Sequence, residues 1–284
     1  MLTVLVTGAT GGIGLQTAKV LAQMGHSVLI HGRDARKGAA AVEAVRGLAP
    51  ANAPVRFLQA DFASLRQVRD LGAEVVASVP RLDVLINNAG CGNISRSETA
   101  DGYETTFAVN HLAPFLLTHL LLDKLKTSAP ARIVNVASRA HRNQQIDFGD
   151  LMSVRGYRVM RTYGRSKLAN ILFTRTLAKR LAASNVTTNC LHPGLVATGI
   201  GQTHPLARLA WRLIVLCRGG ISVVEGAKTS LYLATSPEVA GLSGGYYAKC
   251  RPAQLQTRAE AVADAVGERL WRVSEELVGL PCSS

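Results

Sequence analysis

Aromatic residues are scarce in this chain of 284 residues, at 5% of the composition. The formal net charge is +13, a balance that suits nucleic acid, anionic lipid or a phosphate-rich cofactor as partner. The lysines and arginines are scattered, however, without a run of four or more. Proteins that bind single strands also need more aromatic stacking platforms than this composition offers. We therefore expect no nucleic-acid partner.

Paired cysteines are also missing. The five cysteines are an odd number, and no two of them form a Cys-x-x-Cys motif. This pattern argues against a disulfide framework and against a metal site, and it predicts reduced, mostly buried thiols in a cytoplasmic protein. The cysteines are Cys91, Cys190, Cys217, Cys250 and Cys282.

The sequence shows no export signal and no uninterrupted run of about 18 apolar residues, so we expect a cytoplasmic chain without a spanning helix. It also has no Pro/Ser-rich linker, low-complexity run or internal repeat. With 48% hydrophobic residues, the chain can bury one large core. We therefore predict a single domain over residues 1–284.

A glycine-rich turn joins the first apolar stretch to a helical pattern. Residues 2–7 are expected to form a buried strand, and Thr7, Gly8, Gly12 and Gly14 follow as TGxxxGxG before apolar residues at helical spacing. Glycines let backbone N–H groups approach a pyrophosphate, and the positive end of the helix dipole favours an anion. The strand, turn and helix together predict nucleotide binding.

The second strand, expected at residues 27–30, is followed by Gly32, Arg33 and Asp34. In dinucleotide-binding folds, an acidic residue at this strand end binds the 2′-hydroxyl of NAD, while an arginine suits the 2′-phosphate of NADP. Gly32 leaves the acidic position empty, so Arg33 favours NADP(H). The alternative is that Arg33 is a solvated turn residue and that Asp34 binds the ribose.

Strands continue to alternate with helices along the chain, which predicts a parallel sheet covered on both faces. Polar residues follow the strand ends, where open α/β sheets bind ligands. The third strand, 55–59, precedes Asp61 and a helix with Ser64 as N-cap, and Asp61 could instead be a second N-cap. Further strands are expected at 84–86, 132–137 and 185–191, and further helices at 101–125 and 163–183.

Tyr163 and Lys167 are four residues apart, which places both side chains on one face of a helix. An ammonium nearby favours the phenolate, so we expect a lowered Tyr163 pKa and a group that exchanges protons with an alcohol or carbonyl oxygen. Tyr157 and Arg161 have the same spacing, but arginine offers no compact ammonium. We therefore interpret Tyr157 as wall or surface.

The order and spacing of these motifs resemble the short-chain dehydrogenase/reductase family over almost the whole chain, and its retinol-dehydrogenase-like branch in particular. The resemblance implies a single-domain Rossmann-type α/β fold, a doubly wound parallel sheet with helices on both faces. The matching segments are Thr7-Gly8-x3-Gly12-Ile13-Gly14, Asn87-Asn88-Ala89-Gly90, Asn110, Ser138, Tyr163-x3-Lys167, Pro193-Gly194-x-Val196-x-Thr198 and the tail Gly267-Glu268-Arg269-Leu270-Trp271.

The resemblance also implies four catalytic roles. Tyr163 is the general acid in reduction and the general base in oxidation, and Lys167 lowers its pKa and binds the nicotinamide ribose. Ser138 stabilises charge on the substrate oxygen. Asn110 holds a water that links Lys167 to solvent.

The implied cofactor is NADP(H), with NAD(H) less favoured. One departure is that Gly11 occupies the position of the family's other basic NADP determinant, so the preference depends mainly on Arg33. The implied cofactor-binding residues are Thr7, Gly8, Gly12, Ile13, Gly14, Arg33, Asp61, Asn88, Ala89, Gly90, Tyr163, Lys167, Pro193, Gly194, Val196 and Thr198.

Substrate choice is expected to depend on residues 139–162 and 199–220, with 199–220 as a lid. An amphipathic helix at 204–218 caps the pocket or, alternatively, touches an anionic membrane surface. Either reading predicts an apolar pocket and a lipophilic ketone, aldehyde or alcohol as substrate. The sequence leaves open a catalytically silent NADP(H) sensor, a reductase of carbon–carbon double bonds, and a homodimer through helices 101–125 and 163–183.

Overall fold

One sheet organises the fold. The computed structural model describes residues 1–196 and 220–281, and its strands follow the order β3-β2-β1-β4-β5-β6-β7-β8. The first seven strands are parallel, and β8 pairs antiparallel with β7 at one edge. This is the predicted Rossmann-type order, with the two halves diverging from β1 and β4. The strands are β1 Thr3–Val6, β2 Ser27–Gly32, β3 Val55–Gln59, β4 Val84–Asn87, β5 Ala131–Val136, β6 Val186–His192, β7 Tyr246–Ala248 and β8 Arg251–Pro252.

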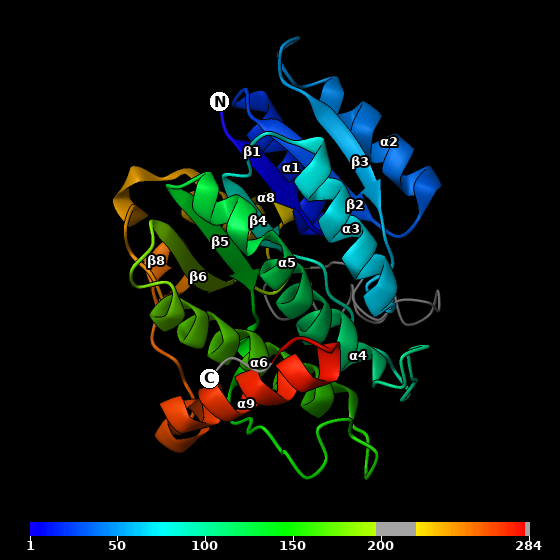
Figure 1. The fold of residues 1–284 in the computed structure, drawn as a ribbon, viewed down its shortest axis with the longest axis vertical. Helices are drawn as coiled ribbons and strands as arrows, with labels where there is room; N and C mark the ends of the chain where they lie inside the picture. Colours follow the sequence, from blue (N-terminus) through cyan, green and yellow to red (C-terminus); the bar gives the residue numbers. More distant parts are fainter. Residues whose placement is uncertain (197–219, 282–284) are drawn as a thin grey trace.

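Helices cover both faces of the sheet (Figure 1). Alternate residues of β1 explain the two layers, because Val4 and Val6 pack into one apolar cluster and Leu5 packs into the other. Helices α1, α2 and α8 cover the first face, and α3, α5, α6 and α9 cover the second. The helices are α1 Gly12–Gln23, α2 Ala35–Arg46, α3 Leu65–Ser78, α4 Thr105–Phe107, α5 Ala113–Thr127, α6 Val159–Arg180, α8 Val223–Thr235 and α9 Asp264–Val278.

The helix predicted at 101–125 begins later and is interrupted. It starts at Thr105, where the Glu104 carboxylate accepts from the N–H groups of Thr106 and Phe107 and caps the end. A π-helical turn, Ala108–Leu112, then separates α4 from α5. Such turns widen a helix locally and are frequent at functional sites, and Asn110 lies at the centre of this one.

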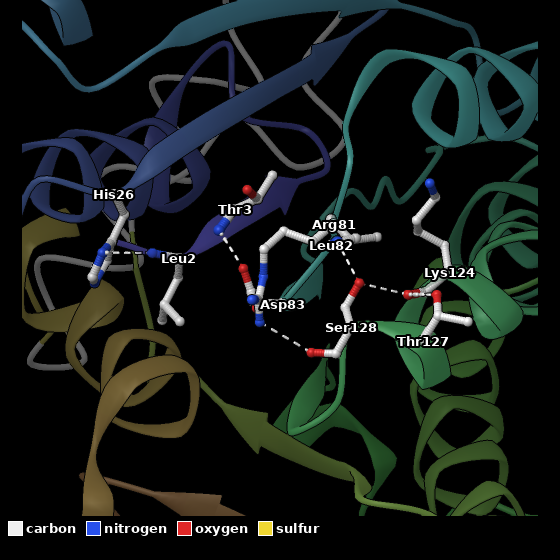
Figure 2. A network of polar contacts seen from close by, with 9 residues as sticks. All are labelled: Leu2, Thr3, His26, Arg81, Leu82, Asp83, Lys124, Thr127 and Ser128. Atoms are coloured by element: carbon white, nitrogen blue, oxygen red, sulfur yellow. Dashed lines mark hydrogen bonds and ion pairs between the residues drawn. The ribbon is translucent and has the colours of Figure 1, made fainter.

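A polar network fastens the amino ends of the central strands, opposite the edge where ligands are expected (Figure 2). The buried Asp83 carboxylate accepts from the Thr3 N–H at 2.7 Å and from Arg81 Nε at 2.8 Å. Arg81 also donates to the Ser128 carbonyl at 3.1 Å, and the Ser128 hydroxyl accepts from the Leu82 N–H at 2.9 Å. These contacts join β1, the start of β4 and the end of α5.

The C-terminal helix α9 lies across α5 and α6 (Figure 1). Trp271 is 4% exposed, and its ring centroid lies 5.1 Å from that of Phe115 and 5.8 Å from that of Phe173. Residues Thr105–Thr127 form a helical stretch that is long and apolar enough to cross a membrane, but 72% of its most apolar window is buried inside the fold. That stretch is accordingly a core helix of the sheet's second face.

Candidate functional site

The glycine-rich turn presents free backbone donors at the carboxyl edge of the sheet. Helix α1 begins at Gly12 and has no side-chain cap, so the first-turn N–H groups of Gly12, Ile13 and Gly14 lack intrahelical acceptors. Gly8 adopts φ +63°, and a Cβ there would lie 2.8 Å from Ala89 Cα. These features fit a pyrophosphate. Without a Cβ at Gly8 the backbone of the turn packs closely against Ala89, and the positive end of the helix attracts an anion.

Two predicted cofactor residues brace this turn instead of facing outward. The Thr7 hydroxyl accepts from the N–H groups of Asn88 and Ala89 at 2.9 and 3.0 Å. The Asn88 side chain donates to the carbonyls of Thr7 and Gly8 at 2.7 and 3.2 Å. A Cβ at Gly14 would overlap that side-chain amide, so the glycine lets the turn close over Asn88.

The carboxyl end of β2 carries no acidic side chain at Gly32, and this glycine packs closely against Thr10. A Cβ at Gly32 would overlap the methyl group of Thr10. Arg33 is exposed, whereas the Asp34 carboxylate caps α2 by accepting from the Lys37 N–H at 3.0 Å. Asp34 is therefore committed to its own helix, which weakens the alternative that it binds a ribose.

Asp61 follows β3 and is half-buried at the same edge of the sheet. Its carboxylate accepts from the Ala63 N–H at 3.0 Å, and its own N–H donates to Gln67 Oε1 at 2.9 Å. Ser64, not Asp61, is the N-cap of α3. The prediction of a Ser64 cap is confirmed, and the reading of Asp61 as a second cap is wrong.

Tyr163 and Lys167 lie on one face of α6, as predicted from their spacing. Lys167 Nζ is 5.6 Å from the Tyr163 ring centroid and donates to the Val136 carbonyl at 3.0 Å. Gly164 allows this helix to approach the serine turn, because a Cβ there would overlap the Ala140 carbonyl oxygen. The helix starts at Val159, four residues before the predicted start at Tyr163.

Burial sets the protonation of this pair. It raises the pKa of Tyr163 to about 12, against the opposing effect of a hydrogen bond with the Ser138 side chain. The expected fall in the Tyr163 pKa is therefore wrong for the protein without cofactor. Burial also lowers the pKa of Lys167 to about 8. At neutral pH the phenol is protonated and can donate, and the nearby ammonium can stabilise the phenolate that remains.

Asn110 links the loop after β4 to α6. Its amide oxygen accepts from the Cys91 N–H at 2.7 Å, and its amide nitrogen donates to the Cys91 carbonyl at 2.8 Å and to Ser166 Oγ at 2.9 Å. A Cβ at Gly90 would lie 3.1 Å from Asn110 Oδ1 and 3.2 Å from Lys167 Nζ. The glycine thus avoids crowding these two groups, and Oδ1 keeps a second lone pair for a water.

The loop after β6 completes the described part of the site. Gly194 adopts φ +99°, and Val196 packs with Ile13 and Ala227 beneath the glycine-rich turn. The buried His192 ring accepts from the N–H groups of Arg139 and Gly194 at 3.3 and 3.4 Å, which couples this loop to the serine turn. Thr198, most of the predicted lid at 199–220 and the predicted helix 204–218 lie outside the described residues.

Two loops beside the catalytic residues are tied together and carry apolar side chains. Tyr157 OH donates to the Asn93 carbonyl at 2.6 Å, so Tyr157 is a wall residue, as its partner Arg161 led us to expect. Arg96 joins the same two loops by donating to the Met152 carbonyl at 3.2 Å. The exposed apolar side chains on these loops and on the first turn of α6 are Ile94, Val154 and Met160.

Sequence reasoning missed Thr10, His31, Gly164 and His192, which shape the site from behind or beside the motif residues. A histidine or threonine carries no spacing pattern by itself, so nothing in the sequence marked these positions. Gly164 was detectable, because it lies between the predicted pair and interrupts a good helical pattern. Among the described residues, Cys91, Cys190 and Cys250 are free thiols, and no cluster of metal-ligating side chains occurs.

An open Rossmann-type sheet, a glycine-rich helix start and the Tyr163–Lys167 pair at the carboxyl edge, with Lys167 buried, define a nucleotide-dependent oxidoreductase. The sequence profile described as short chain dehydrogenase matches residues 2–208. The chain belongs to that family, whose members bind a nicotinamide cofactor and act on alcohol or carbonyl groups.

The similar proteins include several retinol dehydrogenases. Retinol dehydrogenase 14 of Mus musculus is 44% identical over 98% of this chain and 86% of its own length. Human retinol dehydrogenase 12 is 43% identical over the same shares. Among solved structures, an uncharacterised protein from Mycobacterium paratuberculosis has a TM-score of 0.78 and 31% identity, covering 100% of this chain and 96% of its own. These relatives confirm the retinol-dehydrogenase-like branch.

Proposed function

We propose that this chain is an NADP(H)-dependent oxidoreductase that interconverts lipophilic carbonyl compounds and their alcohols, with Tyr163 as general acid and base. The observation that supports this most strongly is the grouping of Ser138, Tyr163 and the buried Lys167 at the carboxyl edge of the sheet. The names of its relatives point to retinoids as one member of the substrate class.

The residues present fit a nicotinamide dinucleotide. The N–H groups of Gly12, Ile13 and Gly14 hold the pyrophosphate, and Lys167 binds the nicotinamide ribose, with Gly90 beside its Nζ lacking a side chain that would crowd it. Pro193, Gly194, Val196 and Thr198 hold the nicotinamide end. When bound, the cofactor supplies or accepts the hydride. NADP(H) is favoured over NAD(H), because Gly32 leaves the acidic position empty and Arg33 stands exposed next to it.

The side chains divide the proton chemistry among themselves. In reduction, the protonated Tyr163 phenol donates to the substrate oxygen, and the Ser138 hydroxyl hydrogen-bonds that oxygen as negative charge develops. The Lys167 ammonium stabilises the phenolate that remains. Asn110 holds a water through which Lys167 exchanges protons with solvent. In oxidation the same groups work in reverse.

A lipophilic substrate suits the surroundings of the site. Ile94, Val154 and Met160 are exposed by 60%, 66% and 59% on the two loops and the helix start that flank it. Contact between exposed apolar side chains of this size and an apolar ligand contributes favourable binding free energy, because it removes apolar surface from water.

The deciding assay follows NADPH oxidation with lipophilic aldehydes and ketones, and runs NADH in parallel. We expect turnover with NADPH, and a fall in kcat of at least about a hundredfold in Tyr163→Phe with unchanged NADPH binding. Tyr157→Phe is the matched control and should retain turnover, because Tyr157 contacts a loop carbonyl.

Arg33→Ala should reduce the NADPH/NADH preference by about tenfold or more, because a charge-assisted bond is lost.

Unchanged turnover in Tyr163→Phe would refute the mechanism, and an unchanged cofactor ratio in Arg33→Ala would refute the assignment of Arg33. NADPH binding without turnover on any substrate would favour the silent sensor instead. Loss of the carbon–carbon double bond from an unsaturated substrate, with its carbonyl intact, would favour an enone reductase.

A further inference from the structure

The imidazole of His31 lies between two loops of the proposed cofactor site. His31 belongs to β2, and it is 3% exposed. Its Nδ1 accepts from the Gly8 N–H at 3.3 Å, and its Nε2 lies 3.0 Å from the Ala60 carbonyl oxygen. Gly8 opens the glycine-rich turn, and Ala60 directly precedes Asp61 after β3. One side chain therefore joins the pyrophosphate end of the site to its adenosine end.

Only one form of the ring satisfies both contacts. A backbone N–H can only donate and a carbonyl can only accept, so Nδ1 must be bare and Nε2 must carry the proton. An imidazolium would set two N–H groups against each other at Gly8 and lose that bond. Burial lowers the pKa of His31 to about 4, which keeps the ring neutral under ordinary conditions.

The backbone carbonyl of His31 and the stacking of its ring also hold the glycine-rich turn in place. Its backbone carbonyl accepts from the Ala9 N–H at 2.9 Å, so both the Gly8 and Ala9 donors are used by this one residue. The ring stacks on buried Phe62 at 4.3 Å between centroids, with an angle of 22°. The turn is thereby fixed at its start, and its remaining donors from Gly12 onward stay free at the helix end.

We propose that His31 is a positioning residue for cofactor binding, because its Nδ1 accepts from the Gly8 N–H and so fixes the start of the glycine-rich turn, while the Ala60 carbonyl orients the ring for that bond. The inference rests on the proposed function, since it concerns the same cofactor site. It predicts a change in cofactor affinity and cofactor KM without a matching change in kcat. Neither ring nitrogen contacts Ser138, Tyr163 or Lys167.

Three substitutions separate the two bonds of the ring. His31→Leu removes both bonds. His31→Asn keeps an acceptor near the position of Nδ1 but loses the donor to Ala60, whereas His31→Gln keeps a donor near the position of Nε2 but loses the acceptor for Gly8. His111→Leu is the matched control, because His111 is also buried, at 1% exposure, and contacts Ser274 Oγ at 2.9 Å, in α9, away from these loops.

The measurement is NADPH affinity without substrate, by fluorescence titration, together with Tm and steady-state kinetics. We expect His31→Leu and His31→Gln to weaken NADPH binding by about tenfold, since each leaves the Gly8 N–H unpaired. His31→Asn should stay within about threefold of wild type. His111→Leu should lower Tm and leave the NADPH Kd unchanged.

Several results would overturn the proposal. One is an NADPH Kd for His31→Leu within about twofold of wild type. Another is equal weakening in His31→Leu and His111→Leu, which would indicate general destabilisation. If His31→Leu does not fold, equal affinities of the Asn and Gln variants would overturn it. Wild-type protein that binds neither NADPH nor NADH would refute the proposed function first, and this inference with it.

Discussion

Burial lowers the pKa of His31, His111 and His192 to about 4 and so keeps three histidine side chains of this fold neutral. Of these, His31 and His111 are 3% and 1% exposed. In an unfolded chain a histidine has a pKa of about 6.5. Between these two values the unfolded state binds more protons than the folded state, so acidification favours unfolding.

We therefore predict that the free energy of unfolding holds steady above about pH 6.5 and falls as the pH decreases towards about 4. Each histidine contributes on the order of 3 kcal/mol across that interval. Urea unfolding at about pH 7, 5.5 and 4.5 measures the fall. In His111→Leu the slope should be smaller by up to about 1.4 kcal/mol per pH unit, and an unchanged slope would contradict the prediction.

The same sensitivity to burial explains why the Tyr163 pKa could not be predicted from spacing. The i, i+4 pattern correctly placed Tyr163 and Lys167 on one helical face. Whether the pKa of the Tyr163 phenol is raised or lowered depends on how much water remains around it. That depends on Ser138 and on the Gly164 contact with the serine turn, which come from a distant part of the chain.

At the scale of elements, the strands and the loops at their ends were largely predictable. Short apolar runs with glycine, asparagine or serine after them mark β1, β4 and β5, because buried parallel strands need continuous apolar sequence. The π-helical turn at Ala108–Leu112 was not predictable, since its sequence fits an ordinary α-helix and tertiary contacts of Asn110 accompany the widening. The β7–β8 pair was missed because its strands are very short.

The Asp83 network in Figure 2 predicts a stability effect that is separate from activity. Asp83 is 1% exposed, and Asp83→Ala would leave the buried Thr3 N–H without its acceptor and free Arg81. We expect a loss of about 2–4 kcal/mol in the free energy of unfolding. The kcat should stay unchanged well below the unfolding transition, because the network lies at the amino edge of the sheet.

Urea unfolding and the NADPH assay on the same preparation measure both quantities. Glu43→Ala is a suitable control: its ion pair with Arg46 is long, at 3.7 Å, and the Glu43 side chain is 78% exposed. That substitution should change stability by less than about 0.5 kcal/mol. A fall in kcat without a fall in stability for Asp83→Ala would show that the network communicates with the active site.

At the scale of the whole molecule, the chain itself covers two surfaces that could pair with a second copy. Helix α9 lies across α5 and α6, where the sequence left open a homodimer. The Trp271 ring packs there against Phe115 and Phe173. The outer edge of β7 is paired with β8. A twin subunit could use these surfaces only by displacing packed aromatic side chains or a hydrogen-bonded strand.

We therefore predict a monomer of 30.2 kDa in solution at micromolar concentration. Light scattering after size exclusion measures the mass directly, and a stable species of about twice that mass would contradict the prediction. Trp271→Ala tests the reason for it. Loss of this buried ring should cost about 3–5 kcal/mol of stability and loosen α9 from α5 and α6. If α9 prevents self-association by covering this apolar face, the variant should dimerise at concentrations where the wild type remains monomeric.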